Sequence, residues 1–150
     1  MSVPRSVIKI NKNGVKYVSN VDRANYTIRE LTRAALRDVG KFICNRFRKS
    51  YYSHFKRRKG RVSRYTQYWV RTRDKMPNLQ VGLKPGGFYG AFQEKGTVKV
   101  NGLGLLEKAA KENINEIIKI EAKYLSAMED EARALGLISE EEYTGGGEDR

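Results

Sequence analysis

The sequence predicts an α+β fold in which two long helices pack on a small, mostly antiparallel sheet, preceded by an N-terminal hairpin. Two long segments carry apolar residues at helical spacing, and the segment between them alternates as strands do. The composition, 39% hydrophobic and 31% charged, is typical of a globular chain, and 150 residues suit one domain. We expect a single domain over residues 1–135 and an acidic, flexible tail over residues 136–150.

Residues 6–19 are expected to form the hairpin. Two β-rich runs, 7–10 and 15–18, flank Asn13-Gly14, a pair that favours a turn with positive φ. Because an isolated hairpin is marginally stable in water, we expect it to lean on another surface. Either the same subunit or a neighbouring copy supplies that surface.

The first long helix is expected to begin at Asn20 or Asp22, whose side chains are suited to capping, and to run to about Tyr52. Its apolar stripe follows spacings of three and four and comprises Ile28, Leu31, Ala35, Val39 and Phe42. Cys44 lies beside this stripe and is expected to be a small core residue.

Residues 61–97 are expected to form the sheet, with strands over 64–73, 79–83 and 88–94 separated by turns rich in proline and glycine. In the middle strand, Leu79, Val81 and Leu83 share one face. The second long helix is expected to start at Leu105 and to end near Gly136. Such a helix is roughly 45 Å long at 1.5 Å per residue, so part of its stripe is expected to face another subunit.

Charge is distributed unevenly along the chain. Residues 1–75 hold 21 basic and 4 acidic residues, whereas residues 129–150 hold 2 basic and 8 acidic ones. So large a surplus repels itself unless a polyanion or an acidic surface is near.

Residues 46–73 interleave basic and aromatic side chains, which permits three interpretations. The block binds nucleic acid, docks on an acidic protein ring, or is a solvated face whose aromatic residues belong to the core. The basic surface is predicted from the following residues: Lys56, Arg57, Arg58, Lys59, Arg61, Arg64, Arg71 and Arg73. The acidic patch that we expect to meet it on a neighbouring copy comprises Glu129, Asp130, Glu131, Glu140, Glu141 and Glu142.

Catalytic and metal-site patterns are weak. One cysteine and one histidine leave no Cys/His metal cluster, and no phosphate-binding loop is present. Gln93-Glu94-Lys95, expected at a strand end, faintly resembles the carboxylate-and-lysine strand of restriction-type nucleases, so a metal-dependent nuclease stays an alternative. No run approaches the roughly 20 apolar residues of a membrane span, and we expect no membrane partner and a reducing, cytoplasmic origin.

Residues 81–97 contain a more specific pattern, read as V-G-L followed by F-Y-G-A-F-Q-E-K-G-T. It resembles the motif of the tailed-phage head–tail joining, or tail-completion, family of minor virion proteins. The residues that match this motif are Tyr89, Phe92, Glu94, Gly96 and Thr97. Residues 100–109 lack the prolines usual in the family, and the N-terminal hairpin and acidic tail are additions to it.

The resemblance implies a structural virion protein without catalysis or cofactor. It implies a homo-oligomeric ring, a hexamer in that family, between the portal or connector protein and the tail terminator or tail-tube protein, with DNA passing through the lumen. The protein is then made in the host bacterial cytoplasm and resides in the virion. Tyr89 and Phe92 are expected to anchor the last strand to a helix. Glu94 is expected to accept backbone amides or to pair with an arginine of the next subunit.

Overall fold

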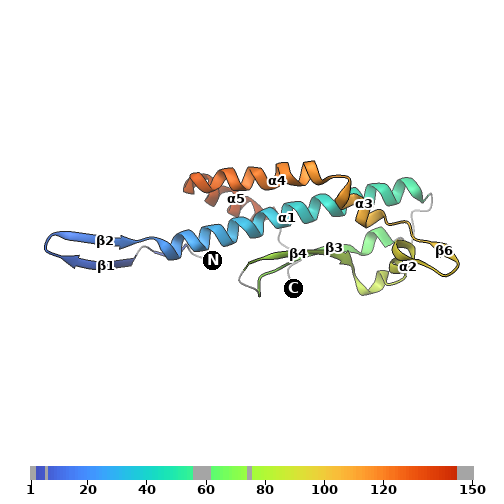
Figure 1. Ribbon diagram of the computed structural model, residues 1–150, viewed down its shortest axis with the longest axis horizontal. Coiled ribbons are helices and arrows are strands. Elements are labelled where there is room, and N and C mark those ends of the chain that lie inside the picture. Colours follow the sequence, from blue (N-terminus) through green and yellow to red (C-terminus); the bar gives the residue numbers. More distant parts are fainter. Residues whose placement is uncertain (1–2, 6, 56–61, 74–75, 145–150) are drawn as a thin grey trace.

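A computed structural model describes residues 3–5, 7–55, 62–73 and 76–144. The molecule is elongated and is built along one long helix, α1 (Val21–His54), as Figure 1 shows. The remaining helices and the sheets lie beside α1 or beyond its ends. The α+β class is therefore confirmed in its broad form, whereas the second long helix and the three-stranded sheet are not.

Helix α1 begins and ends close to the predicted residues. Asn20 occupies the N-cap position, but its side chain makes no capping hydrogen bond; its carbonyl accepts the amide of Ala24 at 2.9 Å. The predicted stripe is largely buried, through Leu31 and Val39, whereas Ile28 is exposed. Cys44 is buried, as expected.

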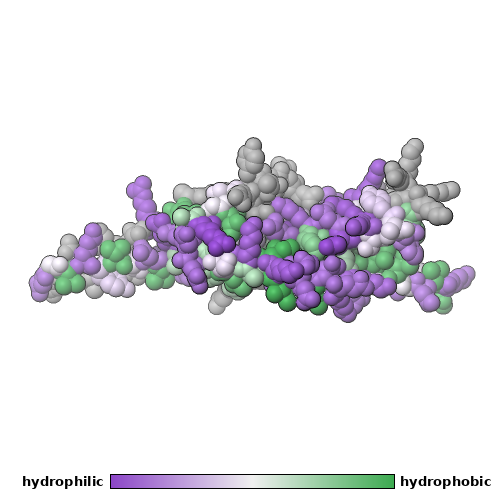
Figure 2. Space-filling model, turned by 90° about the horizontal axis from the view of Figure 1, so that it is seen from above, coloured by the Kyte–Doolittle hydropathy of each residue, from purple (hydrophilic) through white to green (hydrophobic). Residues whose placement is uncertain are grey.

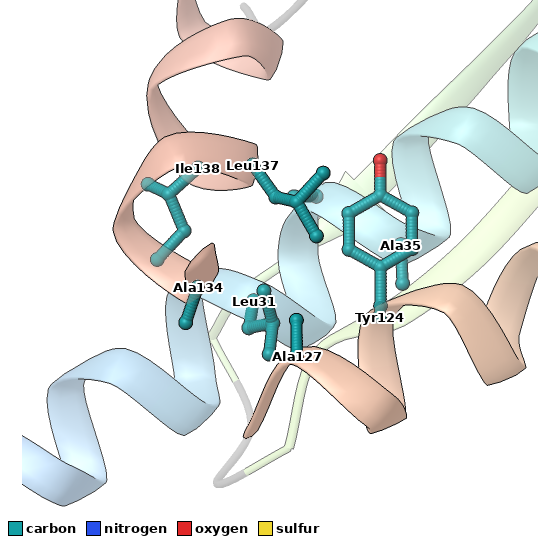
Figure 3. Close-up of a cluster of buried hydrophobic side chains, with 8 residues drawn as sticks. Leu31, Ala35, Tyr124, Ala127, Ala134, Leu137 and Ile138 are labelled. Atoms are coloured by element: carbon teal, nitrogen blue, oxygen red, sulfur yellow. The ribbon is translucent and has the colours of Figure 1, made fainter. Parts of the chain in front are cut away.

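Two hydrophobic clusters follow one another along α1. The first joins Leu31 and Ala35 of α1 to the C-terminal helices through Tyr124, Leu137 and Ile138 (Figure 3). The second lies farther along α1 and is formed by the following buried residues: Val39, Ile43, Phe47, Tyr51, Val62 and Ala109. Ile120 packs against both clusters, so α4 connects the two halves of the core.

The central sheet is a two-stranded antiparallel ribbon. Strand β3 (Thr66–Arg71) follows the short 3-10 helix η1 (Val62–Tyr65) and pairs with β4 (Asn78–Leu83), with Thr66 opposite Leu83. The predicted apolar face of β4 is confirmed, because its three alternating residues pack against the second cluster. The sheet lies against α1, and Tyr68 meets α1 at Gly40, where a Cβ atom would come within 2.7 Å of the Tyr68 ring. This close approach explains a glycine inside the helix.

The predicted third strand, 88–94, is wrong. After the 3-10 helix η2 (Pro85–Gly87), the chain winds into the short helix α2 (Gly90–Lys95). The Phe88 amide donates to the Pro85 carbonyl at 3.2 Å, and the Ala91 amide donates to the Phe88 carbonyl at 3.1 Å. Gly90 packs so closely on Val62 that a Cβ atom would lie 2.3 Å from a Val62 methyl carbon. Short apolar runs with glycine fit either structure, and here local turns and close packing favour the helix.

Helix α2 leads into a small hairpin formed by β5 (Gly96–Thr97) and β6 (Val100–Asn101), with Thr97 opposite Val100. In Figure 1 this hairpin lies at the opposite end of the molecule from the N-terminal one.

The predicted second long helix is broken into pieces. These are α3 (Leu105–Lys111), α4 (Ile114–Ser126), the 3-10 helix η3 (Ala127–Glu129) and α5 (Glu131–Thr144). At the first break, the Asn113 side chain donates to the Ala109 carbonyl at 3.0 Å, a local bond that competes with the helical ladder. At the second break, Asp130 is extended and its carboxylate accepts the Ala132 amide at 2.9 Å. Asp130 thus caps α5, which turns back to pack on α1.

The predicted flexible tail over 136–150 is also wrong for its first part. Helix α5 continues through Gly136, and Leu137 and Ile138 are buried in the first cluster. The Ser139 hydroxyl donates to the Leu135 carbonyl at 2.9 Å inside the helix. The domain therefore extends past residue 135, and residues 145–150 lie outside the described residues.

The N-terminal hairpin lies where the sequence predicts it. Strands β1 (Val7–Lys12) and β2 (Val15–Ser19) are antiparallel, and Asn13 and Gly14 take φ angles of 52° and 79°. Both angles are positive, as a tight hairpin turn requires. Figure 1 shows the hairpin projecting beyond the end of α1 rather than lying on the body of its own subunit.

Candidate assembly surfaces

The motif residues of 81–97 form the corner where α2 meets α3. The Glu94 carboxylate accepts the Leu106 amide at 2.9 Å, in the first turn of α3. Its neighbour Gln93 accepts the Tyr51 hydroxyl at 2.8 Å, which ties α2 to α1. Of the two roles predicted for Glu94, acceptance of a backbone amide is the one that the structure contains.

Gly96 permits the turn that follows Glu94. Its φ is 83°, and a Cβ atom there would lie 2.5 Å from the Gly102 backbone nitrogen. Glycine is therefore required both by conformation and by space. Thr97 begins the β5–β6 hairpin, and its hydroxyl accepts the Lys99 amide at 3.4 Å. The sharp turn at Gly96 ends helix α2 and leads into the β5–β6 hairpin.

The two aromatic residues of the motif have different environments. Tyr89 packs against the second core cluster, as an anchor should. Phe92 is 57% exposed, and so the prediction that it anchors a strand to a helix is wrong. Phe88 is also exposed. This corner therefore carries aromatic side chains on the surface of the chain.

The predicted basic surface is placed only in part. Residues 56–59 and Arg61 lie outside the described residues. Arg64 is exposed on η1, whereas Arg71 and Arg73 line a groove of about 540 Å³ at the end of β3. Arg33 of α1 and Trp69 also line this groove. The groove is therefore lined by three arginines and a tryptophan, residue types suited to phosphates and bases, and one of the arginines, Arg33, also pairs with Glu30 at 3.7 Å.

Other arginines of α1 hold the sheet in place. Arg29 donates to the Thr72 carbonyl at 2.8 Å, and Arg48 donates to the Thr66 carbonyl at 3.1 Å. Arg33 was not among the basic residues predicted for this surface. The signal for it is the recurrence of arginine at every fourth position over 29–37, which places these residues along one ridge of the helix.

Most aromatic residues of the segment 46–73 pack within the protein. Tyr51 is buried, Tyr68 contacts Gly40, and Tyr65 lies against Gly87. Tyr52, in contrast, is exposed. The interpretation that these aromatic residues belong to the core is therefore confirmed for several of them, while Trp69 remains at the groove.

The predicted acidic patch is partly used inside the chain. Glu131 forms an ion pair with Arg23 of α1, and Asp130 caps α5. Glu129 is exposed. The side chains of residues 140–142 lie outside the described residues, although their backbone belongs to α5. Of the three carboxylates of this patch whose side chains the structure describes, two thus have partners in their own subunit.

Besides the exposed aromatic corner at Phe88 and Phe92, two further apolar surfaces face outward. On the hairpin, Val15 and Tyr17 are exposed by 66% and 54%. On α4 and η3, an outward row runs parallel to the stripe that packs into the core, and it comprises Ile114, Ile118, Leu125 and Met128. Figure 2 looks down on the side where α4 lies in Figure 1 and shows apolar side chains on this face and on the projecting hairpin. The sequence signal for the outward row is the pair Ile117-Ile118, which puts apolar residues on two faces of one helix.

The nuclease hypothesis loses its structural premise. Residues 93–95 lie on α2 and not at a strand end, and Gln93 and Glu94 are engaged in the contacts described above. Over the described ranges, no group of three or more Asp, Glu, His or Cys side chains is arranged to hold a metal ion. Within the same ranges, none of the helices combines the length and apolarity needed to cross a bilayer.

Comparison of the chain with models of protein families, with curated proteins and with solved structures finds no match.

Proposed function

We propose that this chain is a non-catalytic structural subunit of a tailed-phage particle, which assembles into a closed ring at the head–tail junction. The self-assembly is supported by the presence of two different outward apolar surfaces on one elongated subunit, and the place at the head–tail junction rests on the resemblance of residues 81–97. A hairpin that stands off the body is marginal in water by itself, and it gains stability when another surface covers it.

A closed ring requires two different contact patches on each subunit. In a ring, one patch of each subunit meets a different patch of the next, whereas a two-fold dimer uses the same patch twice. The hairpin and the α4 row are two different patches of this kind. The motif of residues 81–97 adds the resemblance to head–tail joining proteins, from which the hexameric copy number and the neighbours on the portal and tail sides are proposed.

The experiment is to delete the coding segment from the phage and to analyse the particles. We expect the chain in the protein mass spectrum of purified virions, and we expect the deletion to yield DNA-filled heads and unattached tails. Complementation with the intact chain should restore joined particles. Normal joined particles from the deletion, with the chain absent from wild-type virions, would contradict the proposal.

The basic groove supports a second function, contact with nucleic acid. Arg71 and Arg73 give it the positive charge that binds phosphates, and this contact is compatible with DNA in a ring lumen. Binding to a labelled duplex should weaken steeply with salt, and each of Arg71→Ala and Arg73→Ala should lower the slope by about one. Arg64→Ala, an exposed arginine outside the groove, is the matched control. Equal effects of all three substitutions would contradict a site in the groove.

A further inference from the structure

We propose that the N-terminal hairpin is an arm that docks on the outward face of α4 in a second copy of this chain. This proposal rests on the proposed self-assembly and specifies which surfaces of neighbouring subunits meet in the ring. The partner is a second copy of the chain, because one chain carries both contact surfaces, the hairpin and the outward face of α4. These two surfaces lie apart within one subunit.

The arm offers apolar side chains without a partner surface in its own subunit. Val15 and Tyr17 alternate along β2 and therefore lie on one face of the ribbon. Strands β1 and β2 pack chiefly on each other, and the ribbon extends away from the body along the direction of α1 (Figure 1). Covering this face therefore requires another molecule.

The receiving face is the row on α4 and η3. Ile114, Ile118, Leu125 and Met128 recur at spacings of four, seven and three, which keeps them within one narrow arc of the helix. Leu125 and Met128 also line a hollow of about 170 Å³ against Leu36 of α1. The row is thus a mainly apolar surface, interrupted by Glu121, with a depression at one end.

Charge complementarity favours this pairing. Residues 5–19 contain four basic residues and no acidic residue, whereas residues 112–131 contain six acidic and two basic residues, and one of the six, Glu131, already pairs with Arg23 of its own subunit. Glu121 lies in the middle of the receiving row and lines the same hollow. A basic arm on an acidic, apolar seat is attracted to it, while two arms or two seats repel each other. The charges therefore select head-to-tail contact over a two-fold dimer.

The experiment is cysteine cross-linking between copies of the full chain. A chain carrying Tyr17→Cys is mixed with one carrying Leu125→Cys, and a second mixture pairs Val15→Cys with Ile118→Cys. Native Cys44 is buried, and the wild-type chain reports any background from it. Met76→Cys replaces Leu125→Cys in the control, because both residues are 64% exposed and apolar.

We expect a covalent dimer from the arm–α4 mixtures and background alone from the Met76 mixture. Tyr17→Cys and Leu125→Cys in one chain should give a ladder that ends at the ring size. Leu125→Glu should abolish assembly and Met76→Glu should leave it intact, with both variants retaining the helical circular dichroism of the wild type. Equal cross-linking to Met76, no cross-linking, or cross-linking only to a different virion protein overturns the inference. If virions contain the chain but these cross-links fail, the proposed virion role stands and only the seam is wrong.

Discussion

Gly40 and Gly136 are both helical glycines, and the structure predicts opposite effects for replacing them with alanine. At Gly136, on the exposed side of α5, an added Cβ atom meets nothing within 4 Å. The substitution Gly136→Ala should therefore stabilise the fold by about 1 kcal/mol, because alanine has a higher helix propensity than glycine and no steric clash opposes it.

At Gly40 the same propensity gain is opposed by a steric clash. The added Cβ atom would lie 2.7 Å from two ring carbons of Tyr68 and 2.9 Å from its Cβ atom. The Tyr68 Cβ atom is fixed by the backbone of β3, so rotation of the ring does not relieve the contact and α1 must separate from the sheet. Overpacking of this kind costs about 1–3 kcal/mol. After the propensity gain is subtracted, we expect Gly40→Ala to destabilise the fold by a net of up to about 2 kcal/mol.

The assay is urea denaturation of the wild type and the two variants, followed by circular dichroism at one protein concentration, so that any self-association affects all three equally. The two midpoints should shift in opposite directions while the slope stays unchanged. A Gly40→Ala chain as stable as Gly136→Ala would refute the reasoning, because it would mean that Tyr68 does not press on α1.

Three further predictions concern single contacts. Glu94→Ala should destabilise the fold by about 1 kcal/mol in denaturation, because it removes the carboxylate that accepts the Leu106 amide; Glu94→Gln should recover part of this loss. Thr66→Val should raise the thermal midpoint by roughly 2–4 °C in calorimetry, since the Thr66 hydroxyl is buried without a hydrogen-bond partner; a lower midpoint contradicts this. The hydrogen bond and charge of Lys111 lower the pKa of Glu107 below 4.5, so the pair supports α3 above that pH and loses its effect as pH falls through the lowered value. Carbon-13 NMR should show the Glu107 pKa rising in Lys111→Met, and an unchanged pKa means that the pair is absent in solution.

Elements with strong local signals could be predicted from the sequence. The Asn13-Gly14 pair specifies a turn that few other residue pairs accommodate, and the spacing of Leu31, Ala35 and Val39 defines the buried side of α1. Strand β4 was equally clear because its apolar residues alternate. In each case one local property decides the structure, whatever packs on it later.

Elements decided by tertiary contacts could not be predicted. Whether residues 88–94 form a strand or a helix depends on the contact between Gly90 and Val62, which are far apart in sequence. The break at Asn113 replaces one hydrogen bond by another and leaves the apolar spacing intact. Leu137 and Ile138 follow a glycine and precede three glutamates. Because these neighbours are typical of a polar tail, the sequence does not indicate that the two residues belong to the core. The outward row on α4 was missed for a related reason, since periodicity does not say which of two apolar faces is inside.

Electron cryomicroscopy of the joined particle shows the location of the chain, the number of its copies and the contacts between them. If identical copies form a closed ring at the head–tail junction, we expect one ring around the DNA path, with each copy extending its N-terminal hairpin toward the α4 face of the next. Copies placed singly elsewhere in the particle, or a junction without this chain, would contradict it.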